Sequence, residues 1–472
     1  MDASQIKPLG TARELLWDME RIEALAGKAA LTLHRPEFRD IAIVHDQPWE
    51  GSTCCYHTVF RDSVNYKMYY RGGDRREGKS THPEVTCYAE SDDGVTWRKP
   101  DLGLCAFGGS RANNIILGDD PATHSFTPFF DTRPDCPPEQ AYKALGSSED
   151  GRCGLLAFAS ADGVNWSRLA NEPVITKGRF DSQNVVFWDS SRQLYVGYFR
   201  DLLKFADGRP CRAIKTATSP DFLHWSEPVW LSYDKGTPDE ELYTNAIMPY
   251  PRAPGIYVGF PKRFIANRTT CYDKSGLGWI PGLSDGVFMS SRDGVHFKRW
   301  TEAFVRPGLQ TERWVNRNNM TAWGLVETAP DLPGTPPVLS LYSTENYYSE
   351  DAVRLRRMVM RLDGFVSVQA PMSGGSLITK PFTFSAPASQ EPVTLRLNAS
   401  TSAAGGIRGE ILSADDGRPL PGFAADDCDI LFGDGIDLPM HWRGGDLRPW
   451  SGQPIQLRLE LQDADLFAYR FA

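Results

Sequence analysis

A repeated Asp-Gly turn constrains the fold of this chain more than any other feature. The aspartates of five successive copies lie 69, 59, 72 and 70 residues apart. The copies are Ser91–Trp97, Ser160–Trp166, Ser219–Trp225, Ser291–Phe297 and the degenerate Arg361–Ser367. An Asp-Gly pair between two β-rich runs predicts a tight turn, because glycine readily takes a positive φ. A repeat of this period is typical of radially repeated architectures.

Each copy is surrounded by short strand patterns. The Trp or Phe that follows a turn opens the next strand and is large enough to fill the wedge between neighbouring sheets. A further pair of strand patterns precedes each turn, as in residues 56–60 and 66–70. Four strands per repeat, five times over, predict an all-β chain with a five-bladed β-propeller. Scattered turns in a β-sandwich are the alternative, which the regular spacing disfavours.

Composition limits the functional classes. The chain has 472 residues, which favours two domains. Its net charge of −9 argues against nucleic acid and anionic membranes as partners. Nine cysteines without paired spacing predict free thiols in a reducing compartment. Together with an acidic N-terminus unlike a signal peptide, this predicts a cytoplasmic location. The oligomeric state is left open.

Three pieces are predicted along the chain. Residues 1–30 are expected to form a helical cap, with a capping box at Thr11 and Glu14 and a helix end at Gly27. Residues 31–373 are expected to form the propeller, closed by a strand at Ala30–Leu33. Residues 374–472 alternate strictly between apolar and polar positions, which predicts an antiparallel β-sandwich.

One mouth of the propeller channel is the predicted site. In an up-and-down blade, the loop entering the innermost strand and the loop leaving the second strand face the same mouth, and concave mouths bind ligands. Every blade presents a polar or ionisable group there. The predicted substrate-binding residues are Trp49, Arg71, His124, Phe126, Asn184, Arg200, Tyr243, Arg263, Arg317 and Glu345.

Three acids fall in this set of loops: Glu50, Asp181 and Glu241. Glycoside hydrolysis needs two carboxyl groups that flank the bond, and a third carboxylate commonly tunes the pKa of the acid. The pattern therefore predicts catalytic carboxylates that cleave a terminal sugar from a small saccharide. The competing interpretation is that these acids only neutralise the arginines in a structural ion network.

The architecture resembles the five-bladed glycoside hydrolases of families 32, 43 and 68. A propeller followed by a sandwich is nearest to family 32, and the stretches Pro48–Gly51 and Gly405–Leu412 look like a group of family-32-like bacterial proteins. The resemblance implies a base or nucleophile at Glu50, a stabilising role for Asp181 and a general acid at Glu241. The family's Arg-Asp-Pro motif is absent at the second-blade entry, where residues 124–126 read His-Ser-Phe.

Other classes of function remain open from the sequence. A propeller phosphorylase would use basic groups such as Arg71, Arg200, Lys262 and Arg263 to hold phosphate. A non-catalytic carbohydrate-binding propeller should have equivalent pockets, whereas these blade entries differ from one another. No Cys/His cluster has zinc spacing and no nucleotide-binding glycine loop is found, so no metal or cofactor is predicted. A structural calcium ion would be compatible with the oxygen ligands of the channel.

Overall fold

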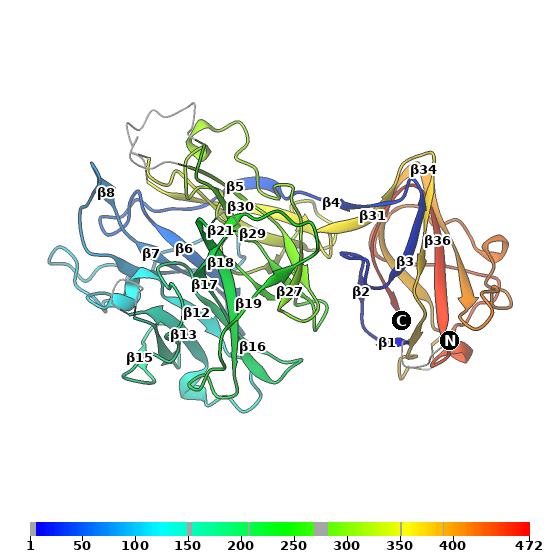
Figure 1. Ribbon diagram of the computed structural model, residues 1–472, viewed down its shortest axis with the longest axis horizontal. Coiled ribbons are helices and arrows are strands. Elements are labelled where there is room, and N and C mark those ends of the chain that lie inside the picture. Colours follow the sequence, from blue (N-terminus) through cyan, green and yellow to red (C-terminus); the bar gives the residue numbers. More distant parts are fainter. Residues whose placement is uncertain (1–5, 149–152, 206–207, 269–281, 350–351, 390) are drawn as a thin grey trace.

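The computed structural model describes residues 6–148, 153–205, 208–268, 282–349, 352–389 and 391–472. These residues form strands joined by loops and a few 3₁₀ turns, so the fold is all-β. Figure 1 shows two bodies, a propeller and a C-terminal β domain, with β4 (Ala30–Leu33) and β31 (Val366–Ala370) running between them. No helix among the described residues is long and apolar enough to cross a membrane.

The propeller is built from five sheets that follow one another along the described chain and are antiparallel except for one edge strand, β20 (Ser232–Tyr233), which pairs in parallel with β27 (His296–Arg299). Blade one contains β6 (Cys55–Arg61), β7 (Tyr66–Gly72), β10 (Val85–Ser91) and β11 (Ile115–Leu117). Blade two contains β12 (Thr127–Phe130), β13 (Tyr142–Ser147), β14 (Leu155–Ser160) and β15 (Ser167–Arg168). Blade three contains β16 (Val185–Asp189), β17 (Leu194–Lys204), β18 (Pro210–Ser219) and β19 (Val229–Trp230).

Blade four is the irregular one. It contains β22 (Met248–Pro249), β23 (Tyr257–Gly259), β26 (Met289–Ser291) and β27 (His296–Arg299), with β20 (Ser232–Tyr233) at its edge. A separate sheet extends it with β21 (Glu241–Leu242), β24 (Lys262–Ile265) and β25 (Leu283–Gly286). Blade five contains β28 (Val326–Thr328), β29 (Val338–Glu345), β30 (Arg354–Arg361) and β5 (Glu37–Val44). A two-stranded hairpin, β8 (Arg75–Arg76) with β9 (Lys79–Ser80), projects from blade one.

The inner strands form a closed ring. β6 contacts β12 and β28, and β16 contacts β12 and β22. The ring closes between blades four and five where Trp323 Nε1 donates to the Ile247 carbonyl at 2.8 Å. The closing strand is β5, which pairs with β30. The prediction that Ala30–Leu33 closes the propeller is wrong, because that strand pairs with β31 outside the blades.

The first four of the five predicted turns share one hydrogen-bond pattern, whereas in the degenerate fifth copy the Asp363 carboxylate accepts from Tyr250 and Arg252. In the first copy, the Ser91 hydroxyl accepts from the Gly94 N–H, and Asp93 Oδ1 accepts from the next two N–H groups at 2.7 and 2.8 Å. The same pattern recurs around Asp162, Asp221 and Asp293.

A tyrosine of the neighbouring blade clamps three of these turns. Tyr69 of blade one donates to the Gly163 carbonyl at 2.9 Å, and Tyr198 of blade three donates to the Gly294 carbonyl at 2.8 Å. Tyr342 of blade five donates to the carbonyl of Gly94. Each of these glycines has a positive φ, and an added Cβ at Gly163 would lie 2.6 Å from the Tyr69 hydroxyl. The turn glycines therefore allow both the backbone conformation and the contact between blades.

The predicted N-terminal helix is not present. Within residues 11–27 the structure has β2 (Glu14–Leu15) and β3 (Ile22–Gly27), which pair with β36 (Ile455–Phe471) and β32 (Gly375–Thr379). Trp17 is almost fully buried, and its ring packs edge-on against Tyr250 of the propeller, with the ring centroids 4.8 Å apart. Strand pairing and this buried contact outweigh the local helix signal, since tertiary context overrides weak propensity.

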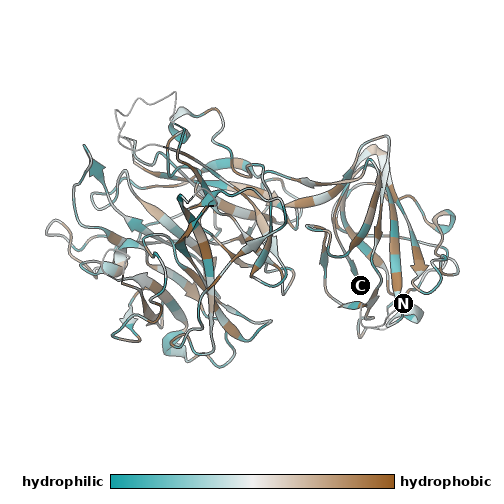
Figure 2. Cartoon of the chain, in the orientation of Figure 1, coloured by the Kyte–Doolittle hydropathy of each residue, from teal (hydrophilic) through white to brown (hydrophobic). Residues whose placement is uncertain are grey.

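The C-terminal domain is one continuous ten-stranded sheet among the described residues. Its long strands are β34 (Leu395–Ser413) and β36, and its other members include β1 (Lys7–Gly10), β33 (Phe382–Phe384) and β35 (Asp434–Pro439). The N-terminal strands thus belong to this domain, which the predicted boundary at residue 374 missed. Apolar residues of the strands form its own core, and Figure 2 shows brown segments along them. Seven cysteines in the described part of the chain are free thiols: Cys54, Cys55, Cys87, Cys105, Cys136, Cys211 and Cys428.

Candidate functional site

Two tyrosines meet where the blade-entry loops converge. Tyr56, on β6 of blade one, and Tyr243, just after β21 of blade four, have hydroxyl oxygens 3.1 Å apart. Both hydroxyl oxygens also lie near the Asp181 carbonyl of the blade-three entry, at 3.3 and 3.4 Å, so the phenol that does not donate to the other can donate to this carbonyl. Three blades that are distant in sequence are therefore joined through one pair of phenols.

Five basic side chains surround this tyrosine pair. Arg71, at the end of β7, lies over the Tyr56 ring with its guanidinium carbon 5.0 Å from the ring centroid. The charged groups around the Tyr243 ring are Arg200 at 4.8 Å, Arg212 at 5.7 Å, Lys262 at 4.2 Å and Arg317 at 5.5 Å. The electron-rich face of an aromatic ring attracts cations. The phenol rings therefore offset part of the repulsion between these like-charged side chains.

Tyr347 completes the cluster from blade five. Its hydroxyl accepts from both Arg71 and Arg317 at 3.0 Å, and its ring packs edge-on against Tyr348. We call the set of Tyr56, Tyr243, Tyr347, Tyr348 and the five basic side chains the basic-tyrosine cluster.

Three carboxylates border the basic-tyrosine cluster. Glu84 pairs with Arg71 at 3.2 Å and with His124 Nδ1 at 2.7 Å. Asp181 pairs with Arg200, and Glu241 pairs with Arg212 at 2.5 Å. The Asp181 side chain is half exposed and that of Glu84 is about a third exposed, whereas Glu241 is only 14% exposed, so Asp181 and Glu84 lie on the accessible side of the cluster.

Burial and charge shift the pKa values within the cluster. Burial raises the pKa of Tyr243, but the charges of Arg317 and Arg200 and the hydrogen bond from Tyr56 outweigh it, so the pKa lies below its usual value. Burial also raises the pKa of Glu84, but Arg71 and His124 reverse the effect and lower it to about 2. Glu84 is therefore ionised throughout the range in which enzymes work.

The structure brings together more than half of the residues predicted for the site. Those with contacts in the cluster or at its border are Arg71, His124, Asp181, Arg200, Glu241, Tyr243 and Arg317. They come from all five blades, as the loop argument predicts.

Glu50 lies in a different network. It is buried, it pairs with Lys99 at 2.6 Å, and it accepts hydrogen bonds from the Gln47 N–H and the Tyr70 hydroxyl. Burial raises the pKa of Glu50, but His45 and Lys99 lower it to about 2. Within the described part of the chain Glu50 shares no partner with Asp181 or Glu241, so the predicted convergence of these three acids is not found there. These contacts match the structural ion network that the sequence left as the alternative.

Five other predicted residues have partners outside the cluster. Trp49 donates to Asn114, and Phe126 packs against Phe158 and Trp166 inside a blade. Asn184 is buried and holds its own loop through the Phe180 and Ser182 carbonyls. Arg263 pairs with Asp285 and Glu240, and Glu345 pairs with Arg356 and Arg313. Arg263 and Glu345 are strand residues, and strand register, which local sequence patterns do not fix, decides which face their side chains take. Trp49, Phe126 and Asn184 lie in loops, where tertiary contacts decide it.

Sequence reasoning missed Tyr56, Glu84, Arg212, Tyr347 and Tyr348. Tyr56 reads in the sequence only as the start of an inner strand, and it has a positive φ of 57° that breaks the alternation. Glu84 is the last residue of the loop that leaves β7 and directly precedes β10, whereas the sequence prediction named only Arg71 at the start of that loop. The Tyr347–Tyr348 pair follows the predicted Glu345 after one residue, Asn346, so extending that segment by three residues would have found it.

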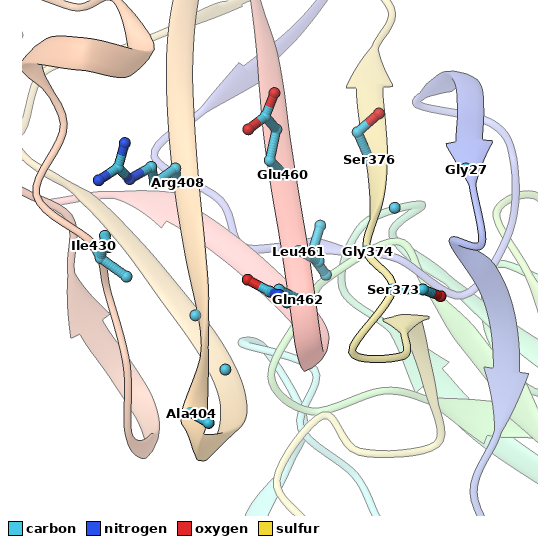
Figure 3. Close-up of a pocket in the computed structure, with 13 residues that line it drawn as sticks. Gly27, Ser373, Gly374, Ser376, Ala404, Arg408, Ile430, Glu460, Leu461 and Gln462 are labelled. Atoms are coloured by element: carbon cyan, nitrogen blue, oxygen red, sulfur yellow. The ribbon is translucent and has the colours of Figure 1, made fainter.

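Among the residues that the structure describes, no group of three or more His, Cys, Asp or Glu side chains could hold a metal ion. Figure 3 shows a pocket in the C-terminal domain, lined by residues of β32, β34 and β36 and by Gly27. Arg408 and Glu460 in this pocket are opposite each other on paired strands, and the pocket lacks a pair of carboxylates. We therefore take the basic-tyrosine cluster with its three carboxylates as the candidate site.

Comparisons with known proteins leave the family open. No family model matches the chain, and no curated protein matches it. Solved structures similar to it include a glycoside hydrolase (14% identity, 69% of this chain and 92% of that chain, TM-score 0.46). Others are an N-acetylgalactosamine deacetylase from F. plautii in complex with blood group B trisaccharide (15%, 70% and 94%, TM-score 0.44) and the catalytic domain of a Coprinopsis cinerea GH62 alpha-L-arabinofuranosidase (10%, 69% and 97%, TM-score 0.43). We draw no functional argument from likenesses this distant, and the resemblance to family 32 stays a prediction.

Proposed function

We propose that the chain is a carbohydrate-active enzyme, a glycosidase that cleaves a terminal sugar from a small saccharide at the basic-tyrosine cluster. The observation that carries the proposal is the position of Glu84, Asp181 and Glu241. They come from three different blades and border one cluster of phenols. Carboxyl groups on opposite sides of a sugar are the minimum that glycosidic cleavage needs.

The three acids differ in what they can contribute. Glu84 stays ionised, so it suits the group that stabilises positive charge on the sugar ring or attacks the anomeric carbon. Asp181 and Glu241 are the candidates for the group that protonates the leaving oxygen. Their partners Arg200 and Arg212 lie over the same Tyr243 ring, so the two acids approach the site from adjacent blades.

A screen of aryl glycosides and oligosaccharides with the full chain tests the proposal. Glu84→Gln, Asp181→Asn and Glu241→Gln are compared with the wild type on any substrate found. We expect at least two of these variants to lose about a hundredfold or more in kcat, as positioned acid–base groups typically contribute that much. Near-full turnover in all three folded variants would contradict it.

The matched control is Glu240→Gln. Glu240 is adjacent to Glu241 in sequence and also pairs with arginines, but those are Arg263 and Arg299 outside the cluster. We expect this variant to keep its turnover. Glu50→Gln belongs in the same series. A large loss of turnover in that variant alone would support the role of base or nucleophile that the sequence predicted for Glu50.

Phosphorolysis is the second candidate, because five basic side chains outnumber three carboxylates at the site. A phosphorylase would release a sugar phosphate and need inorganic phosphate for turnover, whereas a hydrolase would release the free sugar without it. Each substrate of the screen is therefore assayed with and without phosphate. Binding of saccharides without any turnover would instead favour a carbohydrate-binding propeller.

A further inference from the structure

Two cations of the basic-tyrosine cluster lack a carboxylate partner. Arg71, Arg200 and Arg212 pair with the three bordering acids, but among the described residues no carboxylate pairs with Lys262 or Arg317. The Lys262 ammonium donates to Asn316 Oδ1 at 3.1 Å and otherwise contacts aromatic rings. Arg317 donates to the Tyr347 hydroxyl and lies among three tyrosine rings.

Lys262 differs from comparable lysines of this protein. Three lysines are buried in the described part of the chain: Lys67, Lys143 and Lys262. Lys67 pairs with Asp62 at 3.1 Å, and Lys143 pairs with Asp131 at 2.5 Å. Of these three described lysines, only Lys262, which is 1% exposed, has no carboxylate beside it. A buried ammonium without a counter-charge is costly, so natural proteins usually pair it.

The neighbours of Lys262 increase this cost. Burial lowers the pKa of Lys262 well below its usual value, and the charges of Arg317, Arg212 and Arg200 lower it further. Such a concentration of positive charge is unusual in a chain whose net charge is −9. An anion bound between Lys262 and Arg317 would supply the counter-charge that both groups lack and would favour the protonated form of the lysine.

We propose that Lys262 and Arg317 form an oxyanion subsite that binds a carboxylate or phosphate group of the substrates. This inference rests on the proposed function, because the subsite lies beside the same Tyr243 that Asp181 and Glu241 approach. The oxyanion is either the carboxylate of an acidic sugar or the phosphate of a phosphorolytic reaction. The chemistry is the same in both cases: charge-assisted hydrogen bonds from an ammonium and a guanidinium.

Calorimetric titration of the full chain tests the subsite with four probes: inorganic phosphate, glucuronate, galacturonate and neutral galactose. We expect at least one charged probe to bind more tightly than galactose, and to bind more weakly as ionic strength rises. Binding of phosphate alone assigns the subsite to phosphorolysis, and binding of a uronate assigns it to an acidic sugar. Absence of binding by all three charged probes overturns the proposal.

Variants locate the binding. Lys262→Met and Arg317→Gln should each weaken the bound anion about tenfold or more, since a hydrogen bond to a charged group contributes about 1.5–3 kcal/mol. The control is Lys298→Met, because Lys298 also lies over an aromatic ring, that of Trp300, but on β27 outside the cluster. Anion binding that is equal in Lys262→Met, Arg317→Gln and the control refutes the subsite.

The outcome also separates this inference from the proposed function. If the protein cleaves neutral saccharides but binds no anion, the subsite is refuted and the glycosidase proposal stands. If it binds an anion through Lys262 but cleaves no glycoside, the subsite stands and the glycosidase proposal is refuted. Folding is monitored through the melting temperature of the free protein, which we expect Lys262→Met to raise because an apolar side chain replaces a buried amine that has no carboxylate partner among the described residues.

Discussion

The contact between Tyr69 and Gly163 gives the sharpest test of how the blades are held together. Gly163 has a φ of 77°, and an added Cβ would lie 2.6 Å from the Tyr69 hydroxyl that donates to the Gly163 carbonyl. Gly163→Ala therefore has two costs. The left-handed backbone costs alanine about 1 kcal/mol. Displacing the buried tyrosine hydroxyl from its acceptor costs about 1–3 kcal/mol more.

Gly103→Ala is the matched control. Gly103 has a φ of 71°, but an added Cβ there meets no atom within 4 Å. Both variants then share the conformational cost of the left-handed backbone and the loss of unfolded-state entropy. The difference between their free energies of unfolding therefore reports the contact with Tyr69. Urea unfolding, followed by tryptophan fluorescence, measures the free energy of unfolding of both variants. The dependence of that free energy on urea concentration should be the same in both.

We expect Gly163→Ala to be less stable than Gly103→Ala by about 1–3 kcal/mol. Adding Tyr69→Phe should remove most of that extra cost, because the ring then has no hydroxyl for the new methyl group to displace. If the two alanine variants agree within about 0.5 kcal/mol, the tyrosine clamp does not contribute to the contact between blades.

Two further predictions concern buried groups. Glu50→Gln should cost about 3 kcal/mol at pH 7, since a shift of the Glu50 pKa from 4.5 to about 2 corresponds to that free energy. Because the pKa of Glu50 is lower in the folded state than in the unfolded state, this contribution is present above pH 4.5 and is lost as the pH falls towards 2. The difference in the free energy of unfolding between Glu50→Gln and wild type, measured with urea, should therefore be smaller at pH 3 than at pH 7. Trp17→Ala should destabilise the propeller by about 3–5 kcal/mol, because Trp17 is buried against Tyr250 and donates to the Asp363 carbonyl. A calorimetric melting transition that is unchanged in Trp17→Ala would show that the N-terminal segment is not part of the propeller core.

The propeller was predictable because its signal is local and repeated. Asp93, Asp162 and Asp293 each accept from the two N–H groups that a short turn presents, and that geometry needs only a few neighbouring residues. The N-terminal segment was not predictable in this way. Its helix-like spacing is overridden by pairing with β32 and β36, which lie more than 300 residues away in sequence.

The same distinction applies to the site. From the sequence alone, blade order places the entry loops at one mouth, so Asp181, Tyr243 and Arg317 could be expected near one another. Which side of each strand faces the channel depends on register, a long-range property that local patterns do not encode. Only the tertiary structure therefore separates Glu50, buried beside Lys99, from Glu84. Only the packed fold reveals a buried lysine and a partly buried arginine, Lys262 and Arg317, that have no carboxylate partner among the residues it describes.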